Sequence, residues 1–79
     1  MTRTSKNNVG ERIKHARLSH NPALTQDELS GRLAAVGVQL DRAAISKIES
    51  GIRHVLDYEL KALAQVLGVD VDWLLSNKG

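Results

Sequence analysis

The stretch Thr25–Gly51, TQDELSGRLAAVGVQLDRAAISKIESG, predicts two short helices joined by a connection. Thr25 can cap the first helix, and Glu28 stands three residues later, where it completes a capping box. An apolar stripe at helical spacing follows, formed by Leu29, Leu33 and Val36. Gly37 can adopt a positive φ, so we expect this helix to end there.

The second helix of the stretch is predicted to begin after Asp41, its N-cap, and to end at Gly51. At about 100° per residue, one face gathers both isoleucines and should face a core; it consists of Asp41, Ala44, Ile45, Ile48 and Glu49. The opposite face is small, hydroxylic or cationic, and it consists of Arg42, Ala43, Ser46, Lys47 and Ser50. Such a face suits the major groove of DNA, and it equally fits an ordinary solvent-facing surface.

Apolar periodicity predicts three further helices, over residues 9–19, 57–67 and 70–75. Their expected N-caps are Asn8, Asp57 and Asp70. Their expected apolar positions are Val9, Ile13 and Ala16 in the first, Leu60, Leu63, Ala64 and Leu67 in the second, and Val71, Trp73, Leu74 and Leu75 in the third. Gly68 should end the second of these helices. The fold class that follows is all-α, with five short helices and no strand.

Charge is spread unevenly along the chain, although the formal net charge is only +2. Residues 1–20 hold five Lys or Arg against one Glu, whereas residues 54–76 hold one Lys against four acidic residues. We expect an anionic partner at the basic end. We also expect residues 1–7 to form a flexible basic arm, residues 8–76 the folded domain and residues 77–79 a C-terminal tail.

The 79-residue chain has no cysteine, which excludes disulfides and cysteine-ligated metals. The three histidines, His15, His20 and His54, show no metal-ligand spacing, so we expect neither a metal nor a cofactor. No apolar run approaches the length of a membrane span, and the first residues contain no apolar signal core. These features predict a cytoplasmic protein, and binding to DNA through the exposed face described above would make it nucleoid-associated. The sequence also offers no paired nucleophile and base and no glycine-rich phosphate loop, so we do not expect an enzyme.

Five segments occur in a characteristic order over about residues 9–76: VGERIKHAR, LTQDEL, AISKIESG, ELKALAQVLGV and VDWLL. Together they resemble the phage repressor and Cro-type (XRE) helix-turn-helix proteins. The resemblance implies a compact five-helix, lambda-repressor-like domain. It also implies binding to double-stranded DNA, commonly as a homodimer on a two-fold symmetric operator.

The resemblance further implies roles for single residues. Gln26, which opens the second helix, would contact the DNA backbone or an outer base. The exposed face of the third helix would enter the major groove and contact bases through Arg42, Ala43, Ser46 and Lys47. The segment after that helix would grip phosphates through Ser50, Gly51 and Arg53. Arg17 and Glu49 would form a structural ion pair.

The connection between the second and third helices departs from the family pattern. Where the family has a tight LGVSRSTIS, this chain has LAAVGVQLDRAAIS, about five residues more. Either the second helix gains a turn, or the connection becomes a loop closed by Val38 and Leu40. We expect these two apolar side chains to tuck under the domain.

We therefore predict a sequence-specific transcriptional regulator, a repressor that binds a palindromic operator as a homodimer through its third helix. The candidates for the dimer interface are Trp73, Leu74 and Leu75, and closure of the core is an equally good role for Trp73. The alternative is a protein-interaction module, or an antitoxin-like regulator that acts through a protein partner at its acidic C-terminal third. Steep weakening by salt would distinguish DNA binding from an apolar interface.

Overall fold

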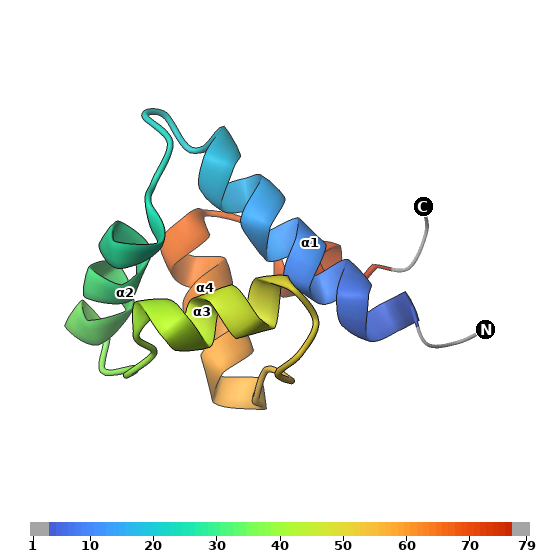
Figure 1. Cartoon of the computed structure of the whole chain (residues 1–79). Coiled ribbons are helices and arrows are strands. Elements are labelled where there is room, and N and C mark those ends of the chain that lie inside the picture. Colours follow the sequence, from blue (N-terminus) through green and yellow to red (C-terminus); the bar gives the residue numbers. More distant parts are fainter. Residues whose placement is uncertain (1–3, 77–79) are drawn as a thin grey trace.

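The computed structural model of the chain describes residues 4–76, with side chains from residue 9 onward. Within this part of the chain, five α helices follow one another: α1 (Thr4–Ser19), α2 (Gln26–Ala35), α3 (Arg42–Glu49), α4 (Asp57–Leu67) and α5 (Val71–Leu75). Figure 1 shows α3 crossing in front of α4, with α2 beside the first turn of α3 and α1 beside its last turn. The helix α5 packs against both α1 and α4.

One apolar core joins all five helices, and each helix contributes at least one buried side chain. The fully buried large side chains are Ile13, Leu29, Leu33, Ile45, Ile48, Leu63 and Leu74. The apolar stripes predicted for 9–19 and 57–67 lie largely in this core, since Ile13, Ala16 and all four positions of α4 are buried. Burial of each large aliphatic side chain contributes about 1.5–3 kcal/mol, and the loss of chain entropy on folding offsets most of this gain.

The first helix begins earlier than its sequence predicts. It starts at Thr4 rather than Val9, so Asn8 lies inside the helix and is not its N-cap. Asn is only mildly unfavourable inside a helix, and no proline interrupts residues 4–8, so the helix can extend past this signal. Residues 4–7 of the predicted arm are therefore helical, while residues 1–3 and the predicted tail 77–79 lie outside the described residues.

The capping box of α2 is confirmed in both directions. The backbone N–H of Glu28 donates to Thr25 Oγ1 over 3.0 Å, and the backbone N–H of Thr25 donates to Glu28 Oε1 over 2.8 Å. Leu24, which precedes this cap, is 4% exposed and was missed by the periodicity. It occupies the staple position before an N-cap, and the fourth helical residue, Leu29, is buried in the same core. This staple pattern is the feature of the sequence that indicates the burial of Leu24.

The connection between α2 and α3 is a loop over residues 36–41. The chain turns at Gly37, whose φ of +87° is unfavourable for a residue with a Cβ. The backbone N–H of Val38 then donates to the carbonyl oxygen of Leu33 over 2.9 Å, and Val38 and Leu40 enter the core. The placement of Val36 on the buried stripe is wrong: it is 42% exposed, because α2 has ended and Val38 fills the core instead.

The later helix ends agree with the sequence at some positions and not at others. Asp41 caps α3, with its Oδ1 accepting from the backbone N–H of Ala44 over 2.8 Å. Gly68 ends α4 with a φ of +73°. The N-cap of α4 is Leu56 rather than Asp57. Asp70 is the N-cap of α5, as predicted, although its side chain makes no capping hydrogen bond. The error at Asp57 comes from assigning a carboxylate near the start of a helix as its cap.

The backbones of α1 and α3 are in close contact where α1 passes the C-terminal end of α3. A Cβ at Gly10 would collide with the carbonyl oxygen of Ile48 and would lie 3.0 Å from that of Glu49. Glycine at this position therefore permits the observed packing of α1 on α3. In contrast, a Cβ at Gly31 of α2 would meet no atom within 4 Å.

We expect Gly10→Ala to lower the free energy of unfolding by about 1–3 kcal/mol, because the added methyl group must separate α1 from α3. The matched control is Gly31→Ala, which should raise that free energy by about 0.5–1 kcal/mol, since alanine favours an exposed helix interior. Urea unfolding followed by circular dichroism measures both. Equal stability of the two variants would contradict the close approach at Gly10.

Candidate nucleic-acid interface

The helix α3 has one buried and one exposed face. Ile45 and Ile48 are 1% and 2% exposed, so they fix the helix on the core. All five side chains predicted for the opposite face lie exposed on one surface, namely Arg42, Ala43, Ser46, Lys47 and Ser50. The structure thus presents two cations, two hydroxyls and one methyl group together on a helix at the front of Figure 1.

The first turn of α3 carries an exposed cation, Arg42, whose only ion pair is long and solvent-exposed in the described part of the chain. One guanidinium nitrogen of Arg42 lies 3.9 Å from Asp27 Oδ2, and both side chains are about 70% exposed. An exposed pair at this distance contributes little to stability, at most about 1 kcal/mol. Arg42 can therefore leave Asp27 for a better acceptor on a ligand.

The last turn of α3 is closed by the chain that follows it. The carbonyl oxygen of Lys47 accepts from the backbone N–H groups of Ile52 and Arg53, over 2.9 and 3.2 Å, and from the Ser50 hydroxyl over 3.2 Å. Gly51 has a φ of +83°, is buried, and donates its N–H to the carbonyl oxygen of Ile48. The Gly51 N–H is therefore not free for a phosphate.

The expected partners Arg17 and Glu49 meet in the interior. Arg17 Nε donates to Glu49 Oε2 over 2.7 Å and Arg17 Nη2 donates to Glu49 Oε1 over 2.9 Å, with side-chain exposures of only 8% and 5%. Arg17 Nη1 also donates to the carbonyl oxygen of Leu24 over 2.9 Å. Gln26 Nε2 donates to Glu49 Oε1 over 3.1 Å. One carboxylate thus joins α1, the start of α2 and the end of α3.

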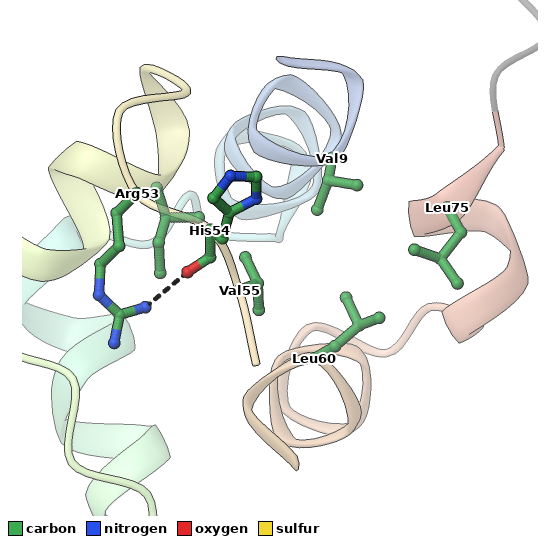
Figure 2. Close-up of a pocket in the computed structure, with 7 residues that line it drawn as sticks. Val9, Arg53, His54, Val55, Leu60 and Leu75 are labelled. Atoms are coloured by element: carbon green, nitrogen blue, oxygen red, sulfur yellow. Dashed lines mark hydrogen bonds between the residues drawn. The ribbon is translucent and has the colours of Figure 1, made fainter. Parts of the chain in front are cut away.

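A second ion pair, which the sequence did not suggest, fixes the segment between α3 and α4. Two guanidinium nitrogens of Arg53 donate to the two carboxylate oxygens of Glu59, each over 3.0 Å, and Arg53 also donates to the carbonyl oxygen of His54 (Figure 2). Glu59, 2% exposed, accepts in addition from the backbone N–H of Leu56. The position of Glu59, three residues after the N-cap Leu56, is the feature of the sequence that indicates its capping role.

The Arg53–Glu59 ion pair shifts the pKa of both side chains. Hydrogen bonding to Arg53 lowers the pKa of the Glu59 carboxyl from its ordinary value, although burial alone would raise it. The same hydrogen bond raises the pKa of Arg53. Because the guanidinium of Arg53 already has three acceptors and is one-third exposed, a phosphate would have to compete with Glu59 for it.

The three candidates for a dimer interface have different surroundings. Leu74 is fully buried in the core, so it is not available to a partner and that assignment is wrong. Trp73 is half-buried against α1, where the guanidinium of Arg12 lies 4.9 Å from its ring centre. Leu75 is 49% exposed, and Figure 2 shows it beside a hollow of about 240 Å³ together with Val9 and Leu60.

The histidines of the described residues lie in three separate environments. Within them, no group of three or more His, Asp or Glu is arranged to hold a metal ion. His15 lies beside Ser19 and Trp73, His20 beside the carbonyl oxygen of Pro22, and His54 at the hollow, so the three are apart. None of the helices in the described part of the chain is long and apolar enough to cross a membrane.

Comparison with protein families gives one match. A family model described as helix-turn-helix matches residues 13–74, which is more than half of the chain and includes all of α2 and α3. Neither the curated proteins nor the solved structures gave a significant match.

We expect Arg17→Met to lower the free energy of unfolding by about 3–5 kcal/mol, because it leaves the Glu49 carboxylate buried without its cation. The double variant Arg17→Met/Glu49→Met should recover most of this loss, since it removes both charges and keeps similar volumes. Urea unfolding measures both variants. A double variant at least as unstable as the single one would show that the buried charge is not the cause.

We also expect the contribution of Glu59 to stability to depend on pH. Since its pKa is lowered on folding, the ionised pair stabilises the protein fully above about pH 4.5 and is lost as pH falls through the folded pKa. The difference in unfolding free energy between the wild type and Glu59→Gln should therefore shrink as pH falls below about 4.5. Glu11→Gln, at an exposed position of α1, is the control for removal of a carboxylate charge. A Glu59→Gln difference that is constant from pH 7 to pH 3 would contradict the lowered pKa.

Proposed function

Because this chain belongs to the Cro/C1-type (XRE) helix-turn-helix family of DNA-binding, non-enzymatic domains, we propose that it regulates transcription by reading double-stranded DNA with the exposed face of α3. The observation that carries the proposal is the division of α3 into two faces. The isoleucines hold one face on the core, while the other presents cations, hydroxyls and a methyl group to the outside. A helix of this kind fits the major groove, and the match to a DNA-binding family favours this use of the face over an ordinary solvated surface.

Four of the five side chains of the exposed face have a chemistry that suits base edges. Arg42 and Lys47 can donate to N7 and O6 of guanine, Ser46 can donate or accept, and Ala43 can contact a thymine methyl group. Contacts to phosphates would supply much of the affinity, while these base contacts would choose the sequence.

The proposed backbone contacts come from the two ends of the helix-turn-helix unit. Gln26 opens α2 and is half-buried, and Ser50 follows α3 and is exposed. We assign Arg53 mainly to ordering residues 52–56, because its guanidinium is bound to Glu59 and His54. Gly51 would let the chain turn and come close to a phosphate. Its N–H would not bind the phosphate, because it already donates to the carbonyl oxygen of Ile48.

We further propose that the protein binds as a homodimer and represses. A single α3 has only eight residues, so one copy makes few base contacts, and a two-fold symmetric pair on adjacent major grooves doubles them. Repression requires only occupancy of the operator, whereas activation also requires a surface that contacts another component of transcription. The simpler requirement favours repression.

Exposed apolar side chains favour one second candidate, a regulator that acts through a protein partner. Ile52, Leu56 and Tyr58 are 72%, 51% and 59% exposed within seven residues of one another. Exposed apolar side chains that form one patch are typical of protein contacts, and these three lie close enough in sequence to contribute to one. An apolar interface of this kind would be insensitive to salt, whereas DNA binding weakens steeply as salt rises.

The test of the proposed function is selection of binding sites from random duplex DNA at about physiological salt. We expect an inverted repeat with half-sites about one helical turn apart, and binding that weakens with salt. Recovery of no sequence above background would overturn sequence-specific binding. Recovery of single half-sites without a repeat would overturn the dimer alone.

We expect Arg42→Ala and Lys47→Ala each to weaken binding to the selected duplex by about 5- to 150-fold, because each removes one base contact worth about 1–3 kcal/mol. Thermal unfolding should stay unchanged, since both side chains are exposed. Lys61→Ala, an exposed cation on α4, is the control for loss of charge alone. Unchanged affinity and sequence preference in both α3 variants would exclude α3 as the reading helix.

A further inference from the structure

The side chain of Gln26 is held by a buried charge before any ligand is present. Its Nε2 donates over 3.1 Å to Glu49 Oε1, the same oxygen that accepts from Arg17 Nη2 over 2.9 Å. The Glu49 side chain is 5% exposed and that of Arg17 is 8% exposed, so water competes little for this oxygen. The carboxylate cannot turn away, because Arg17 Nε holds its other oxygen.

This hydrogen bond fixes which way the amide of Gln26 faces. A primary amide has two N–H groups and one carbonyl oxygen. Rotation of the amide by half a turn would bring its oxygen against Glu49 Oε1, and two acceptors repel. One N–H is therefore committed to Glu49, while the second N–H and the carbonyl oxygen remain for another partner.

We propose that Glu49 is a positioning residue for DNA binding, which holds the Gln26 amide in one orientation so that its second N–H meets an acceptor on the DNA. The inference rests on the proposed function. It gives the Arg17–Glu49 pair a role beyond joining α1 to α3, since the same carboxylate orients a group at the start of α2. An amide that is already ordered loses less side-chain entropy on binding.

Two kinds of acceptor on DNA suit the second N–H of Gln26, and they differ in whether they also donate to the carbonyl oxygen of its amide. A phosphate oxygen would accept from the second N–H alone. Adenine would accept that N–H at N7 and also donate its N6 amino group to the amide oxygen, which is the bidentate contact that glutamine makes in the major groove. Both sources use the same positioned N–H of Gln26.

The test compares two double variants that differ only in the acceptor at position 49. Arg17→Met/Glu49→Gln keeps a carbonyl oxygen for the Gln26 amide, and Arg17→Met/Glu49→Met removes it, while both eliminate the buried charges. Gln26→Ala is then added to each and to the wild type, and affinity for the selected duplex is measured at constant salt. Circular dichroism melting confirms that each variant is folded.

We expect Gln26→Ala to weaken binding by about fivefold in the wild type and in the Arg17→Met/Glu49→Gln background, as for loss of one hydrogen bond. In the Arg17→Met/Glu49→Met background the loss should be under about twofold, because the amide is no longer positioned. An equal loss in all three backgrounds would overturn the proposal, since a merely structural role for Glu49 predicts that result.

A measurement on the free protein does not depend on DNA or on the folding of the variants. Nuclear magnetic resonance relaxation of the side-chain amide nitrogens should show Gln26 ordered, and the exposed Gln39 and Gln65 mobile. Equal mobility of all three amides would overturn the proposal. If the wild type binds no selected duplex, the proposed function fails and this inference fails with it, even where Gln26 is ordered.

Modified duplexes identify the acceptor. Replacement of single phosphates by methylphosphonates, or of single adenines by 7-deazaadenine, removes one acceptor at a time. We expect one such replacement to abolish the effect of Gln26→Ala in the wild type. An effect of Gln26→Ala that survives every replacement would overturn the assignment of its N–H to a DNA acceptor.

Discussion

The buried carboxylate of Glu49 is the interaction on which the arrangement of the helices depends. An ionised carboxylate in a protein interior is strongly destabilising unless cations and donors surround it. Here the donors come from positions distant in the sequence, Arg17 on α1 and Gln26 on α2. The charge is therefore satisfied only when three helices take one relative position. Gly10, seven residues before Arg17 on the same face of α1, permits this position, because the backbone of α1 there lies against the carbonyl groups of Ile48 and Glu49.

The helix that faces the proposed ligand depends on this framework, since it has only eight residues. An isolated helix of two turns is not stable in water. Asp41 satisfies a free backbone N–H at its start, and residues 50–53 fold back on the Lys47 carbonyl at its end. The Arg53–Glu59 pair then holds that returning segment on α4. The backbone of α3 is therefore ordered before any ligand binds.

Local chemistry explains which features could be predicted from the sequence. The capping box at Thr25, the cap at Asp41 and the turn at Gly37 depend on neighbouring residues alone, and all three are confirmed. The burial of Leu74 and the exposure of Val36 depend instead on which neighbouring side chains fill the core, where Val38 is buried in place of Val36. The Arg53–Glu59 pair was also missed, because its formation requires the chain between α3 and α4 to close on itself, which no periodicity reports.

The longer connection between α2 and α3 lies at the N-terminal end of α3. The start of α2 and the end of α3 are tied together by Gln26 and Glu49, so this end is fixed. The end of α2 and the start of α3 are joined by residues 36–41, whose Val38 and Leu40 anchor in the core. The additional residues are therefore accommodated at the Arg42 end. Because Lys47 lies near the fixed end, a change of loop length alters the placement of Arg42 more than that of Lys47.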